Sequence, residues 1–175
     1  MVYLVTGGAG FIGANYVRYL LKTGEDAKVI VLDAFTYAGN PDNLKEFINE
    51  SNILMPSKYA FLDIEKVDTS NWTVKNVPLQ VGKIKKRWEY KFDGYKLNPF
   101  TPETLERSLG ENKLTIVVGN IVDRELVEIL FKYPDYVVHF AAETHVDRSI
   151  LNPDEFVKTD VYGTYVLLEA LRNSH

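Results

Sequence analysis

Glycines cluster where the first apolar run of the chain ends. Residues 6–13 read Thr-Gly-Gly-Ala-Gly-Phe-Ile-Gly, which satisfies two glycine spacings typical of dinucleotide-binding turns. A turn without side chains lets the backbone approach a pyrophosphate, and the free N–H groups of a following helix attract that anion. The alternative is a glycine turn that only packs against its neighbours. The spacing therefore predicts a dinucleotide site with contacts at Gly7, Gly10 and Ile12.

An acidic residue supports this prediction. Asp33 lies 20 residues beyond Gly13, at the end of the second apolar run. A carboxylate in that place can accept hydrogen bonds from the adenosine ribose diol, whereas it repels the 2′-phosphate of NADP. Because no arginine immediately follows Asp33, we expect the cofactor to be NAD.

Strands and helices must alternate along the chain to position these residues. Short apolar runs rich in β-branched residues predict buried strands, and longer segments with helical spacing separate them. Such alternation indicates an α/β fold, a Rossmann-like doubly wound parallel sheet with right-handed crossovers. The expected strands are 2–5, 28–33, 115–118 and 136–140, and the expected helices are 11–23, 40–48, 124–131 and 155–172.

Two segments compete for the position beside the strand 28–33. Residues 58–62 and residues 115–118 both form apolar runs that lead toward an acidic or amide residue followed by isoleucine. We favour 115–118, because the segment from Arg124 continues into the expected helix and the segment from Glu65 does not.

The stretch 52–112 interrupts the alternation, and we expect it to be a small β-rich insertion between Rossmann segments 1–51 and 113–175. Asp93-Gly94 predicts a two-residue type I′ hairpin turn that places Phe92 opposite Tyr95. Lysines and aromatic residues interleave around this turn. These residues would bind single-stranded nucleic acid or an anionic sugar nucleotide. Alternatively, the lysines would form the solvent-exposed face and the aromatic residues the buried face of a hairpin. Period-2 alternation favours the half-buried hairpin.

The composition is that of a globular domain without a membrane or nucleic-acid function. The 175 residues carry a net charge of −4 and no cysteine, and 46% of them are hydrophobic. Basic residues are too few for nucleic acid to be an expected partner. No run is long and apolar enough for a membrane span, and no leader precedes Met1, so we expect a cytoplasmic protein that starts near Met1.

Four motifs together resemble the extended short-chain dehydrogenase/reductases, and within them the dTDP-glucose 4,6-dehydratases. They are the glycine turn 6–13, Asp33 with Thr-Tyr-Ala-Gly-Asn at 36–40, Gly-Asn-Ile-Val-Asp at 119–123, and His-Phe-Ala-Ala-Glu-Thr-His-Val-Asp-Arg-Ser at 139–149. The last of these is the most specific. The resemblance covers about residues 1–50 and 113–172 and leaves the insertion unmatched.

The resemblance implies an NAD site and a neighbouring nucleotide-sugar site. Asn120 stands where the family has an acid that contacts adenine, and its carbonyl group would accept from the adenine amino group with weakened binding. Asp160 replaces a usual asparagine, which puts the local backbone support of the site in doubt. Thr144 and His145 would face the nicotinamide end of the cofactor and the hexose. The implied cofactor-binding residues are Gly7, Gly10, Phe11, Ile12, Asp33, Thr36, Gly39, Asn120, Ile121, Phe140, Ala141 and Ala142.

The family's reaction requires residues that this chain lacks. It oxidises C4 of the sugar by hydride transfer to NAD, eliminates water across C5 and C6 and returns the hydride, using a tyrosine and a lysine four residues later. None of the eleven tyrosines has that lysine, and the chain ends at His175, before the fifth strand of the family. We therefore expect a truncated, catalytically incomplete NAD-binding portion of a nucleotide-sugar dehydratase, with no catalytic or metal residue to assign. The alternative is a non-enzymatic or engineered NAD-binding module that uses the insertion as a recognition surface.

The strand 136–140 should form an exposed edge of the sheet. An unpaired apolar edge favours pairing, so we expect either the insertion to fold back over it or the chain to associate with a missing half or with a copy of itself. We favour self-association, because the insertion leaves from the opposite side of the sheet. In the family, the final helix normally packs on the sheet and leads into the absent fifth strand, so we expect its apolar stripe to be only partly covered. The stripe is formed by Phe156, Val161, Tyr165, Leu168 and Leu171.

Overall fold

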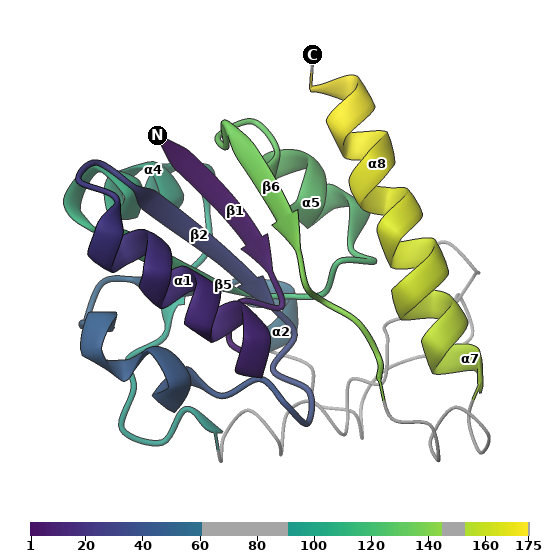
Figure 1. Ribbon diagram of the computed structural model, residues 1–175, viewed down its shortest axis with the longest axis horizontal. Coiled ribbons are helices and arrows are strands. Elements are labelled where there is room, and N and C mark those ends of the chain that lie inside the picture. Colours follow the sequence, from purple (N-terminus) through teal and green to yellow (C-terminus); the bar gives the residue numbers. More distant parts are fainter. Residues whose placement is uncertain (61–90, 145–152, 175) are drawn as a thin grey trace.

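A six-stranded parallel sheet forms the centre of the protein. The computed structural model describes residues 1–60, 91–144 and 153–174. The strands lie in the order β4-β3-β5-β2-β1-β6 (Figure 1), and every pair is parallel. Their bounds are β1 Val2–Thr6, β2 Lys28–Asp33, β3 Ile53–Met55, β4 Asn98–Pro99, β5 Leu114–Val118 and β6 Tyr136–His139.

Helices cover both faces of this sheet. Helix α1 and the 3-10 helix η1 lie on one face, and α4, α5 and α8 pack on the other (Figure 1). Sequence signals set their ends, because Thr101 and Thr104 form a capping box at α4 and the side chain of Asn40 caps η1. The helices are α1 Phe11–Thr23, η1 Pro41–Phe47, α2 Ser57–Ala60, α4 Pro102–Glu111, α5 Arg124–Leu130, α7 Pro153–Phe156, the π-helical η3 Val157–Gly163 and α8 Thr164–Asn173.

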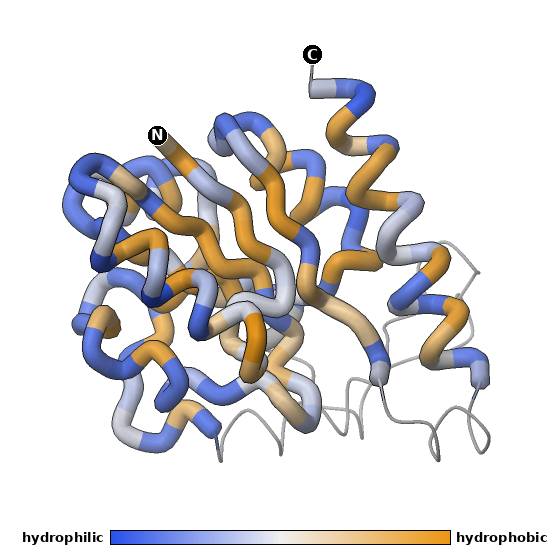
Figure 2. Tube along the Cα trace, in the orientation of Figure 1, coloured by the Kyte–Doolittle hydropathy of each residue, from blue (hydrophilic) through white to orange (hydrophobic). Residues whose placement is uncertain are grey.

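The core lies in two layers because successive strand side chains point to opposite faces. Val29 and Val31 of β2 pack in the layer under α1. Ile30 and Leu32 of the same strand pack in the layer under α4, α5 and α8. Figure 2 shows the resulting apolar centre along the strands. The prediction of strands buried on both faces is confirmed for β2 and β5.

The choice between the two candidate third strands is settled in favour of residues 115–118. β5 pairs with β2 from Val29 with Leu114 to Asp33 with Val118, whereas residues 58–60 belong to the short helix α2. Strands β3 and β4 extend the sheet beyond β5, so both ends of the stretch 52–112 belong to the sheet. Each of these strands is too short to show a period of its own in the sequence. The separate subdomain stays a prediction only for residues 61–90, which lie outside the described residues.

The type I′ hairpin expected at Asp93-Gly94 is wrong in its geometry. A turn is present, since the Tyr95 N–H donates to the Phe92 carbonyl at 3.0 Å. Gly94 has a φ of +80°, but Asp93 does not share the positive φ that type I′ requires. Phe92 is buried against Phe35, with ring centroids 4.7 Å apart, and the chain continues into β4, which runs parallel to β3. Residues 84–90, the other arm of the expected hairpin, lie outside the described residues.

The apolar stripe of the final helix is only partly covered, as expected. Val161, Tyr165, Leu168 and Leu171 are exposed, and α8 packs on the sheet through Val166, Leu167 and Ala170.

Strand β6 lies at one end of the strand order, as expected for residues 136–140, and self-association through it stays a prediction. None of the helices in the described ranges has the length and apolar character that a membrane crossing needs.

Candidate functional site

A cleft that is partly open to solvent lies at the carboxyl ends of the central strands. Ligands of open parallel sheets bind at this edge. The residues expected at the site and found lining the cleft are Gly7, Gly10, Asp33, Thr36, Gly39, Asn120, Ile121, Phe140, Ala141 and Ala142. Lining residues that the sequence reasoning missed are Leu32, Ala34, Ala38, Gly119, Glu143 and Thr159.

Phe11 and Ile12 were expected in this set but do not line the cleft. Their side chains point outward from the first turn of α1, with exposed fractions of 82% and 66%. Phe11 and Ile12 are the first residues of α1, so they can contribute to the site through their backbone N–H groups but not through their side chains.

The glycine turn is packed so closely that side chains are excluded. Gly7 has a φ of +66°, and a Cβ atom on it would lie 2.6 Å from the backbone nitrogen of Ala141. A Cβ on Gly13 would overlap with the carbonyl oxygen of Gly7. Gly10 is the N-cap of α1 and provides no side-chain cap. Within the described residues, therefore, no side chain caps the first N–H groups of α1, which follow the cleft-lining Gly10.

Asp33 is anchored by backbone donors. Its side chain accepts from the N–H of Ala9 at 2.9 Å and from the N–H of Phe35 at 2.8 Å, and the residue is only 7% exposed. Burial raises the pKa of this carboxyl group, and the two N–H groups together with the nearby charge of Lys91 oppose that rise. A Cβ on Gly39 would lie 2.5 Å from Asp33 Oδ1, so the loop 36–39 closes directly over the carboxylate.

Lys91 holds that loop from the other side. Its ammonium group donates to the carbonyl oxygens of Thr36 and Gly39. Lys91 is one of the lysines that interleave with aromatic residues before the Asp93-Gly94 turn, and the sequence pattern does not indicate this contact. No local signal could reveal it, because Lys91 is 55 residues from Thr36 along the chain.

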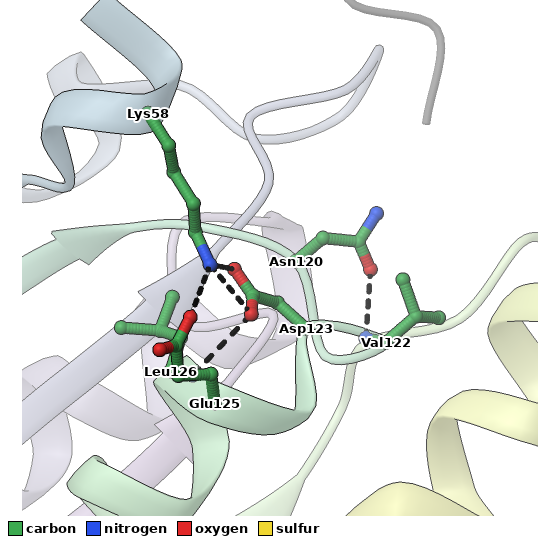
Figure 3. Close-up of polar contacts among 6 residues, drawn as sticks. All are labelled: Lys58, Asn120, Val122, Asp123, Glu125 and Leu126. Atoms are coloured by element: carbon green, nitrogen blue, oxygen red, sulfur yellow. Dashed lines mark hydrogen bonds and ion pairs between the residues drawn. The ribbon is translucent and has the colours of Figure 1, made fainter. Parts of the chain in front are cut away.

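Asn120 follows β5 at the same edge. The N–H of Val122 donates to Asn120 Oδ1 at 3.1 Å, so the carbonyl group assigned to an adenine amino group already accepts a backbone hydrogen bond. Figure 3 shows the amide nitrogen turned away from Val122.

The start of α5 beside Asn120 carries a charge cluster. Asp123 caps the helix by accepting from the Leu126 N–H at 3.3 Å. The Lys58 ammonium lies 2.6 Å from a carboxylate oxygen of Asp123 and 3.5 Å from Glu125 (Figure 3). This end of α5 is therefore already occupied by carboxylates.

The expected sugar-side residues are placed only in part. The hydroxyl groups of Thr144 and Tyr37 lie 2.8 Å apart, whereas His145 lies outside the described residues. Asp160 accepts from the Glu143 N–H at 2.8 Å. The aspartate thus supplies a backbone contact next to the cleft in spite of the change from asparagine.

The comparisons with known proteins agree with this geometry. Residues 3–79 match the family model described as NAD dependent epimerase/dehydratase family, and residues 93–175 match the one described as GDP-mannose 4,6 dehydratase. The low-salt glycan biosynthesis protein Agl12 of Haloferax volcanii is 36% identical over 97% of this chain and 35% of its own length. The dTDP-glucose 4,6-dehydratase of Mycobacterium tuberculosis is 32% identical over 98% of this chain and 33% of its own length.

Solved structures show the same relationship. A dTDP-glucose 4,6-dehydratase from Streptomyces venezuelae, solved with NAD bound, is 31% identical with a TM-score of 0.59 and matches 99% of this chain and 36% of its own chain. The enzyme from Bacillus anthracis, in complex with NAD, is 28% identical with a TM-score of 0.54, over 99% of this chain and 34% of its own. The chain thus spans about a third of the length of these relatives. Over nearly its whole length it resembles the N-terminal part of the dTDP-glucose 4,6-dehydratases among the extended short-chain dehydrogenase/reductases.

Proposed function

We propose that this chain binds NAD in the cleft, as the cofactor-binding portion of a nucleotide-sugar 4,6-dehydratase. The observation that carries the proposal is that one cleft brings together the tightly packed glycine turn and Asp33. The free N–H groups at the start of α1 would receive the pyrophosphate. When bound, NAD would supply a hydride acceptor for oxidation of a sugar carbon.

Asp33 would select the adenosine ribose. Each carboxylate oxygen accepts one backbone N–H and keeps a lone pair for a ribose hydroxyl group. The same charge would repel a 2′-phosphate, which favours NAD over NADP. Lys91 would act as a positioning residue, because it holds the loop 36–39 in place next to Asp33.

Isothermal titration calorimetry with NAD and NADP tests the proposal. The protein should bind NAD more tightly than NADP. Asp33→Asn removes the charge and leaves one acceptor for the backbone. The affinity for NAD should therefore fall by about tenfold, and the ratio of the affinities for NAD and NADP should decrease. Asp26→Asn is a matched control, because Asp26 lies in the loop before β2, at the opposite end of the strand from Asp33. Equal affinity for both cofactors in the unchanged protein contradicts the role of Asp33.

The sugar half of the proposal rests on the names of the relatives and on the position of Thr144. This residue follows Glu143, which lines the cleft, and contacts Tyr37 of the ribose-side loop. Incubation with dTDP-glucose and NAD, followed by detection of a 4-keto-6-deoxy sugar product, tests turnover separately. Binding of NAD without product supports a cofactor-binding portion that does not complete the reaction alone.

A further inference from the structure

One loop of the cleft wraps around a positive charge that comes from far along the chain. Residues 36–39 form neither helix nor strand, so their carbonyl groups need partners from outside the loop. The carbonyl oxygens of Thr36, Tyr37 and Gly39 all accept from the ammonium group of Lys91. A lysine ammonium group has three N–H donors, so the loop presents as many carbonyls as one such group can bind.

The backbone next to this loop is strained and needs support. Phe35 has a φ of +48°, in the left-handed region that a bulky residue rarely adopts. Such a conformation persists only where the surroundings hold it in place. The Phe35 ring is fully buried and packs edge-on against Phe92, the neighbour of Lys91. Two adjacent residues, Lys91 and Phe92, therefore hold the loop and the strained residue before it.

The charge of Lys91 also acts on Asp33. The loop closes over this buried carboxylate at Gly39. Burial raises the pKa of Asp33, and the charge of Lys91 is among the influences that oppose the rise. An apolar side chain in place of Lys91 would leave the loop carbonyls without this donor and the carboxylate without this charge. Both losses are costly where water has little access.

We propose that the loop 36–39 is a receptor for a primary ammonium group, which Lys91 fills, and that the ribose end of the cleft forms only while this receptor is occupied. A small ammonium ion that is not attached to the chain can then take the place of the lysine head group. The receptor follows from the contacts of Lys91 alone. Its effect on the cofactor rests on the proposed NAD binding.

Chemical rescue of Lys91→Ala tests the proposal. The variant lacks the side chain beyond Cβ, and propylammonium has the same atoms as the missing part. In calorimetry, the affinity of the variant for NAD should fall by about tenfold, and excess propylammonium should restore it by about threefold or more. The melting temperature should fall by about 4 °C and rise again with propylammonium. Tetramethylammonium is the matched control ion, because it has the charge but no N–H donor.

Two further variants separate the charge from packing and from surface effects. Lys91→Met keeps an apolar stem without the charge, so it should lose as much NAD affinity as Lys91→Ala, and its stem should prevent rescue. Lys96→Ala removes an exposed lysine of the same segment and should leave both readings unchanged. A Lys91→Ala protein that folds only with propylammonium supports the receptor.

Two results would overturn the proposal. One is full NAD affinity in Lys91→Met, and the other is an equal response of Lys91→Ala to propylammonium and to tetramethylammonium. If the unchanged protein does not bind NAD, the proposed function fails, and the melting temperatures alone decide whether the loop is an ammonium receptor.

Discussion

Helices α1 and α5 both begin at the same edge of the sheet, but their N-termini are built in opposite ways. Helix α1 starts at Gly10, without a side-chain cap and without an acidic residue in its first turn. Helix α5 starts at Asp123, whose carboxylate caps it, and carries Glu125 in its first turn. Lys58 bridges these two carboxylates (Figure 3).

The difference shows how one sheet edge directs an anion to one helix. A helix N-terminus carries partial positive charge and free N–H groups, and either a side chain or a ligand can satisfy them. At α5 the protein supplies its own carboxylate, which stabilises the helix and leaves no place for a phosphate. At α1 glycines replace the cap, so the same groups remain available to a ligand.

Filling the space at the start of α1 with a side chain should have the largest effect, on the free energy of unfolding. Gly13→Ala places a Cβ against the backbone of Gly7 and Gly8, so we expect a loss of about 3 kcal/mol in the free energy of unfolding. Gly110→Ala is the matched control. It lies in α4 with open space around its Cβ position, and we expect it to stabilise by about 0.5–1 kcal/mol. Urea unfolding measures both, and equal effects would contradict the close packing.

Giving α1 the cap that α5 has should convert one helix start into the other. Gly10 has an extended backbone, with φ −78° and ψ 177°, which aspartate adopts readily. Gly10→Asp should preserve the fold and lower the affinity for NAD by about a hundredfold. Its carboxylate would accept hydrogen bonds from the first N–H groups of α1 and repel the pyrophosphate. Gly10→Ala adds a Cβ without charge. If calorimetry shows that both variants bind NAD equally, the open helix start does not hold the pyrophosphate.

Removing the cap of α5 should have a smaller effect, on stability alone. Asp123→Ala leaves the Leu126 N–H and the Lys58 ammonium without this partner, which should cost about 1 kcal/mol of unfolding free energy. Asp123→Asn retains a capping oxygen and should recover most of it. The affinity for NAD should stay within about twofold, and a larger loss would place Asp123 in the cofactor site.

The smallest expected effect is the pH dependence of stability that His139, next to the end of β1, causes. His139 of β6 contacts Thr6 through Nδ1 at 2.6 Å and Thr164 through Nε2 at 3.2 Å. Partial burial lowers the pKa of His139, and the charge of Asp160 opposes this. Because the folded pKa lies below the unfolded value, the unfolded chain takes up protons first as the pH falls, and stability is lost from about pH 6.5 downward.

His139→Gln cannot titrate, so it isolates this contribution. Between pH 7.5 and 5.5, the unfolding free energy of the unchanged protein should fall more steeply than that of the variant. Chemical denaturation at each pH measures both slopes. Parallel slopes would show that the His139 ring does not titrate differently in the folded state.

Much of the fold could be predicted because its signals are local. Asn40 caps the helix expected over residues 40–48, and the apolar runs of β1, β2 and β5 form buried strands. Strand β4 could not be predicted, because its two residues are too few to show any period.

The sequence by itself determined the glycine turn, the position of Asp33 and the parallel order of the central strands, because these depend on residues near one another in the chain. Only the tertiary structure decided which groups surround them. It brought Lys91 to the loop 36–39 and set Lys58 against Asp123. Long side chains such as lysine reach partners that lie dozens of residues away, and their geometry exists only once the sheet has brought those segments together.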